Sequence, residues 1–127
     1  MKQVFFTLIL ALAIGVSVSG FAKDAQDDAA IAAFNAYRVR CGLRPCALDN
    51  NLQNIAQNHS NQMYRRQQMY HSGTAGVAEN VYMGSSYGVH AVQAWINSPP
   101  HRANMVGPYT RVGIAHTGGF YTMVLAW

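Results

Sequence analysis

Three side chains in two short segments of the sequence are able to carry out acid–base or metal chemistry together. His71 begins the segment HSGTAGVAEN, and Glu79, the only glutamate in the chain, lies near its end. His101 follows two prolines in the segment SPPHRANM. Two imidazoles and one carboxylate can bind zinc, or another divalent ion, while leaving positions open for water. Without a metal, the glutamate could instead orient one histidine for general acid–base catalysis.

The spacing of these residues does not by itself bring them together. The interval between His71 and Glu79 is not that of a zinc-protease helix motif, so three separate structural roles are the alternative. We expect structural or surface roles for the other histidines. His59 lies on the apolar face of a predicted helix, where we expect a core histidine bonded to the backbone. We expect His90 and His116 to be exposed to solvent.

The N-terminus has the features of a signal peptide over residues 1–22. Lys2 provides the positive charge, an apolar run extends from Val4 to Val18, and the small residues Gly20 and Ala22 precede the expected cleavage point. We therefore expect a secreted or periplasmic protein that keeps no stable membrane insertion. Residues 23–28 are expected to be a linker, and residues 29–127 a single small domain.

Export also bears on the two cysteines of the chain. Cys41 and Cys46, in the segment RCGLRPC, are predicted to form a structural disulfide because an exported chain meets an oxidising environment. Two free thiols are the alternative.

The composition argues against a nucleic-acid partner. Charged residues make up 11% of the chain, compared with about 25% in an average soluble protein. The formal net charge is +4, and the one pair of adjacent basic residues is Arg65 and Arg66. Nucleic-acid binders usually cluster more lysine and arginine than this.

Two helices are expected in the first half of the domain. An apolar stripe over residues 31–38 predicts the first, with Asp27 or Asp28 as its N-cap and Gly42 as its left-handed end. The second begins near Asp49 and has one apolar face.

The second half is expected to contain a third helix and a β hairpin. Ser85 or Ser86 is predicted to cap the helix, and Pro99 and Pro100 to end it. The segments RVGIAH and YTMVLAW alternate in β fashion around TGGF, with one face of the last strand on the core. Helices followed by a hairpin predict an α+β fold.

Several motifs, taken in order, resemble the CAP superfamily of cysteine-rich secretory proteins, antigen 5 and pathogenesis-related 1 proteins, also called SCP domains. The matching segments are FNAYRVRCGLRPCALDNNLQNIAQNHSNQM, HSGTAGVAEN, AVQAWINSPPHRANM, RVGIAH and YTMVLAW. They span nearly the whole predicted domain and are similar to compact bacterial members.

The resemblance implies a three-layer α-β-α sandwich with a central antiparallel sheet and a shallow cleft. It places His71, His101 and Glu79 in that cleft, whereas the position of a second family acid is Ser98 in this chain. Asn80 is expected to hold the turn beside Glu79 through side-chain bonds to the backbone.

The resulting functional prediction is a secreted binding module. Its ligands would be a divalent metal, with zinc favoured, held by His71, Glu79 and His101, and/or a lipid or cell-surface ligand. The alternative is a metal-dependent extracellular hydrolase of peptidase type, and a third class is an extracellular structural protein. We assign no catalytic residue, because no nucleophile motif and no second acid are present. Enzymatic activity and the oligomeric state are left open.

Overall fold

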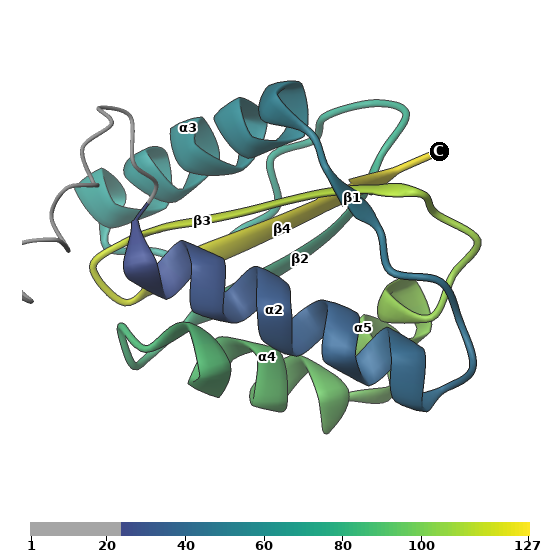
Figure 1. Ribbon diagram of the computed structural model, residues 1–127. Coiled ribbons are helices and arrows are strands. Elements are labelled where there is room, and N and C mark those ends of the chain that lie inside the picture. Colours follow the sequence, from purple (N-terminus) through teal and green to yellow (C-terminus); the bar gives the residue numbers. More distant parts are fainter. Residues whose placement is uncertain (1–23) are drawn as a thin grey trace, which may run out of the picture.

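The computed structural model describes residues 24–127, so the predicted signal peptide lies outside the described residues (Figure 1). The helices of this part are α2 (Ala25–Arg40), α3 (Asn50–Arg66), α4 (Gly88–Ile96) and α5 (Pro99–Met105). The strands are β1 (Ala47–Leu48), β2 (Ala78–Met83), β3 (Arg111–Thr117) and β4 (Phe120–Ala126).

These strands form one sheet in the order β1-β3-β4-β2. The hairpin predicted around TGGF is confirmed, since β3 and β4 pair antiparallel from Arg111 opposite Ala126 to Thr117 opposite Phe120. Strand β2 pairs antiparallel with the other side of β4. The two-residue strand β1 pairs parallel with β3, so the sheet is mixed at this edge rather than wholly antiparallel as expected.

Helices cover both faces of the sheet and give the expected three-layer α-β-α sandwich (Figure 1). Helix α3 packs on one face, where Leu52 and Ala56 meet Val124. Helices α2, α4 and α5 lie on the other face, where Trp95 and Met123 belong to one core cluster. Every residue of β4 is buried, so both faces of this strand, and not one as expected, contribute to the core.

The ends of the helices agree with the sequence only in part. Asp49 caps α3 by accepting a 2.9 Å bond from the Leu52 N–H, and Gly42 has a left-handed φ of 82°, as predicted. The cap of α2 is Asp24 and not Asp27 or Asp28. Residues 25–28, expected to be linker, form the first turn of that helix.

Three elements, β1, β2 and α5, were not predicted from the sequence, and the cap of α4 was misplaced. Pro99 and Pro100 end α4 as expected, but they also begin α5, because proline tolerates the first helical turn. Strand β2 is specified by its partner β4 rather than by a local pattern. Neither predicted serine caps α4; Ser85 Oγ instead accepts a 3.0 Å bond from the Tyr87 N–H just before it.

The structure does not contain the predicted disulfide between Cys41 and Cys46. Both are free thiols, with Cys41 exposed and Cys46 buried. The position of the Cys46 thiol explains the difference, because its Sγ is buried and donates to the Tyr109 carbonyl at 3.3 Å while Cys41 is exposed. The Asn35 side chain holds the backbone of Cys46 through two hydrogen bonds of 2.8 and 3.0 Å.

The two thiols should therefore react differently. Burial raises the pKa of the Cys46 thiol, although the charge of Arg38 opposes this, and the thiolate is the reactive form. Iodoacetamide should label Cys41 in the native protein and label both cysteines only after denaturation, as measured by intact mass and peptide mapping. A Cys41→Ser variant should take up no label under native conditions. Failure of both thiols to react in unreduced, denatured protein would contradict the structure and favour a disulfide.

Candidate functional site

Glu79 lies on β2 and holds the segment that contains His71. One carboxylate oxygen, Oε1, accepts hydrogen bonds from His71 Nδ1 at 2.7 Å and from the Ser72 N–H at 2.9 Å. The other, Oε2, accepts from Ser72 Oγ at 2.5 Å. The side chain of Glu79 is only 8% exposed. The contact between His71 and Glu79 therefore ties the loop after α3 to the sheet.

The Glu79 carboxylate is held in its charged form. Burial would raise its pKa, but hydrogen bonds from the Ser72 side chain, the Ser72 backbone and His71 outweigh burial, with help from the nearby His59. The pKa of Glu79 is consequently below its ordinary value. Since both oxygens already accept hydrogen bonds, the geometry makes Glu79 a partner that orients His71.

The His71 imidazole has one nitrogen engaged and one available. An ionised carboxylate accepts hydrogen bonds but cannot donate them. The Nδ1 atom of His71 must therefore carry the hydrogen of this bond. The neutral ring then has its lone pair on Nε2. The side chain is 63% exposed, so this lone pair is accessible to a metal ion or a proton.

His101 lies in the first half of α5 and is oriented in a similar way. Its Nδ1 is 2.8 Å from Ser98 Oγ, so the serine at the position of the second family acid contacts the imidazole directly. Burial lowers the pKa of His101, and the charge of His71 lowers it further.

A buried amide joins β2, which carries Glu79, to α5, which carries His101. Asn80 has no exposed surface, and its Nδ2 donates to the His101 carbonyl at 3.0 Å. Asn104 Nδ2 donates to Asn80 Oδ1 at 2.9 Å and to the Glu79 carbonyl at 3.4 Å. Asn80 was expected to hold the turn beside Glu79, but it holds α5 against β2.

The roles of Ser72 and Asn104 were not predicted from the sequence. The signal that could have found Asn104 is its place three residues after His101, on the same side of a helix. Because α5 was not predicted to be a helix, the three-residue spacing did not indicate that Asn104 and His101 share a face. Ser72 adjoins His71, but only the fold shows that it binds the carboxylate.

The three predicted ligands do not form a compact three-ligand site. Among residues 24–127, one group of three metal-ligating side chains has its ligand atoms within 4.8 Å of one another: Asp24, Asp27 and His116. Glu79 instead binds His71 Nδ1 at 2.7 Å, so its carboxylate lies on the side of the ring away from Nε2.

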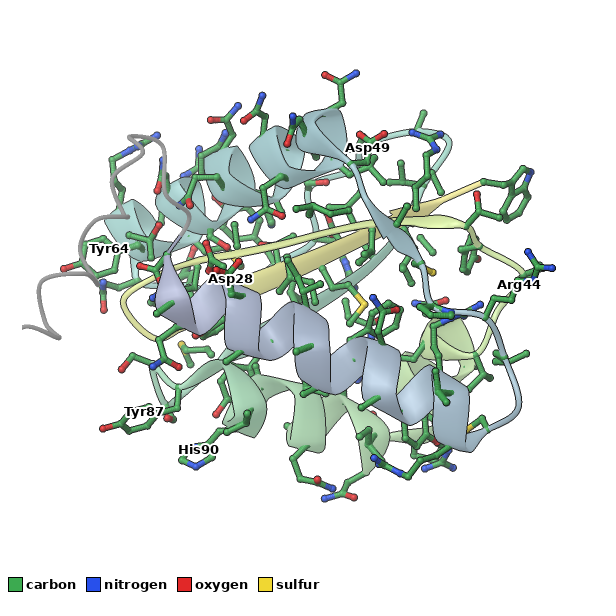
Figure 2. All side chains as sticks on the ribbon, in the orientation of Figure 1. Asp28, Arg44, Asp49, Tyr64, Tyr87 and His90 are labelled. Carbon is green, nitrogen blue, oxygen red and sulfur yellow. The ribbon has the colours of Figure 1, made fainter. Side chains whose placement is uncertain are left out.

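The other histidines show where the sequence predictions succeeded and failed. His59 is buried, and its Nε2 is 2.5 Å from the Tyr70 carbonyl, as expected of a core histidine. His90 is exposed and points away from the body of the molecule (Figure 2). The prediction for His116 was wrong. Its side chain is 12% exposed and lies 2.7 Å from Asp27, because the first turn of α2 packs beside the end of β3.

Family comparison gives a clear assignment. Residues 31–124 match the model of the cysteine-rich secretory protein family, named CAP. The chain belongs to this family, which confirms the resemblance seen in its motifs. A search of curated proteins gave no significant match.

Three of the similar solved structures come from bacteria. An extracellular protein containing an SCP domain from Bacillus anthracis str. Ames has a TM-score of 0.74 and 24% identity, over 80% of this chain and 40% of that chain. A cysteine-rich secretory protein from Staphylococcus aureus subsp. aureus Mu50 has a TM-score of 0.62 and 20% identity, over 79% and 37% of the two chains. An outer surface protein from Borrelia burgdorferi has a TM-score of 0.64 and 18% identity, over 81% of this chain and 92% of that chain.

These likenesses establish the fold. The chain spans 40% or less of the first two proteins, and identities below 25% carry no information about the site residues. Within residues 24–127, no helix is long and apolar enough to cross a membrane.

The predicted proximity of His71 and His101 can be tested by titration. With metal removed by a chelator, His101 should bind its proton at a pH below the ordinary 6.5. The His71→Ala substitution should move the midpoint of His101 protonation upward, toward pH 6.5, because it removes a charged group that lowers the pKa of His101. Histidine side-chain NMR signals measure both values, and His90→Ala provides the control that should leave the His101 midpoint in place. An unchanged His101 midpoint in His71→Ala would show that the rings do not share a site.

Proposed function

We propose that this member of the cysteine-rich secretory protein family is an exported binding module that holds a divalent metal ion, zinc first, between His71 and His101. One observation carries the proposal: each imidazole has its Nδ1 engaged by a fixed partner, Glu79 or Ser98. In His71 the Nδ1 hydrogen faces Glu79, which leaves the lone pair on Nε2. The proposal requires the same tautomer in His101, with Nδ1 donating to Ser98 Oγ and Nε2 as the ligand atom. The family assignment and the predicted leader at residues 1–22 support export.

Glu79 would act on the metal through His71. A carboxylate that accepts the second ring hydrogen fixes the tautomer of a metal-binding histidine and raises its basicity. The buried, ionised Glu79 meets this requirement at 2.7 Å from His71 Nδ1. Two protein ligands leave several coordination positions for donor atoms of another molecule, such as a lipid headgroup or a cell-surface group.

A metal-dependent hydrolase is the alternative function for the same cleft. A bound zinc ion would supply an activated water molecule in an open position. Hydrolysis also needs a group that accepts a proton from this water, and the Glu79 carboxylate already accepts three hydrogen bonds. The cleft is therefore better suited to binding than to turnover.

Zinc titration of the metal-free exported protein tests the metal site. His71→Ala and His101→Ala should each abolish binding at the cleft. Glu79→Gln should weaken it by about 10- to 100-fold, the usual effect of losing a partner that orients a ligand. Affinity should also fall as the pH drops below about 6.5, since the ligands must be neutral. Calorimetry measures each effect.

Two controls make this titration decisive. His90→Ala, which changes an exposed ring outside the cleft, should leave the affinity unchanged. His116→Asn removes the histidine of the other three-residue group and should not affect cleft binding. Equal zinc binding by the wild type and the His71→Ala/His101→Ala double variant would rule out the cleft as the metal site.

A further inference from the structure

A cavity lies on the α3 side of the loop that Glu79 holds. Its volume is about 270 Å³, and it is bounded by α3 and the segment 70–74. The inner wall consists of four buried or half-buried side chains: Ile55, His59, Tyr70 and Ser72. The rim consists of three exposed side chains: Asn58, Gln62 and Thr74. The metal proposal uses none of these residues as a ligand, so the cavity is a separate candidate site.

The cavity is lined by hydrogen-bonding groups that remain available. Asn58 and Gln62 are one helical turn apart on α3, and neither side-chain amide has a hydrogen-bond partner among residues 24–127. Each amide offers both donors and an acceptor. Tyr70, which lines the same cavity, has a buried hydroxyl without a partner in this described part of the chain. Most buried polar groups in native proteins are paired, so the unpaired Tyr70 hydroxyl favours a polar ligand, to which the exposed amides of Asn58 and Gln62 could also bond.

The wall of the cavity is fixed before any ligand binds. His59 Nε2 lies 2.5 Å from the Tyr70 carbonyl, and Ser72 is anchored to Glu79 through its backbone and its hydroxyl. The Thr74 N–H donates to Ser72 Oγ at 3.0 Å, and Gly73 between them has a left-handed φ of 79°. A preformed wall lowers the entropic cost of binding.

The chemistry and size of the cavity define the class of ligand. Within the described residues, no aspartate, glutamate, lysine or arginine lines it, so an ion would find no opposite charge there. Neutral amides and hydroxyls around the apolar side chain of Ile55 suit a molecule with many hydroxyl groups and one C–H face. The volume is below the roughly 300–1,000 Å³ of pockets for drug-sized ligands, which limits the ligand to about one ring.

We infer that this cavity binds one neutral saccharide unit, through the amides of Asn58 and Gln62. Adjacent hydroxyls of a sugar ring can donate to and accept from these two amides at once. A peptide segment could also pair with amides, but an extended chain needs a longer groove than this cavity provides. The inference does not depend on a metal in the cleft.

An NMR titration of the ¹⁵N-labelled exported protein, with metal removed by a chelator, tests the inference. The probes are the methyl glycosides of glucose, galactose, mannose and N-acetylglucosamine. At least one should shift amide signals of residues 55–62 and 70–74, with a dissociation constant of about 1–10 mM, as expected for so small a ligand. Asn58→Leu and Gln62→Met keep the side-chain size and should each weaken binding by about three- to tenfold.

The controls separate sugar recognition from peptide binding and from effects on α3 as a whole. Asn54→Leu changes an exposed asparagine of α3 that does not line the cavity, and it should leave affinity unchanged. Absence of shifts with all four glycosides, or unchanged affinity in both Asn58→Leu and Gln62→Met, would overturn the inference. Shifts at the same residues with N-acetylglycine methylamide, but with no glycoside, would assign the cavity to peptides and would overturn it too. Because the solution contains no free metal, none of these results bears on the zinc proposal.

Discussion

The position of His101 depends on how α5 is held, because this seven-residue helix is too short to be stable alone. Two buried side chains hold it from opposite ends. Asn80 donates to the carbonyl of His101 itself. At the other end, the Arg38 guanidinium donates to the carbonyls of Met105 and Gly107 at 2.8 and 2.9 Å. The backbone that carries His101 is therefore held in place because a strand and a distant helix both bind α5.

Arg38 is unusual because it is a buried cation bound mainly by backbone. Only 3% of its surface is exposed, and two further bonds reach the carbonyls of Arg44 and Tyr109. Burying a charge is costly unless its hydrogen bonds are satisfied, and four carbonyls provide this. The same four bonds connect α2 to the chain before β1 and to the chain before β3. One side chain thus fixes two connecting segments that have little regular structure of their own.

The sequence was informative where structure is decided locally. The Asp49 cap, the Gly42 helix end and the hairpin at TGGF follow from the properties of a few adjacent residues, and all are present. Strand β2 and helix α5 depend on partners far away in the chain, and periodicity could not reveal them.

The site divides in the same way between local and distant causes. Its histidines and glutamate were found through the family motifs, and the His71–Glu79 contact is present. The clamp by Asn80 and the burial of His116 depend on which elements pack together. The free thiols depend on Tyr109, a residue distant in the chain, whose carbonyl accepts the hydrogen bond of the buried Cys46 thiol.

The single glutamate connects the cleft with the cavity. Glu79 fixes the ring of His71 on one side and, through Ser72, the loop that forms the cavity wall on the other. Its pKa is lowered in the folded state. The stability it contributes is therefore complete above its ordinary value of 4.5 and is lost as the pH falls through the lower folded value. Protonation would remove acceptors from His71 and Ser72 together, so both regions keep their shape over the same pH range.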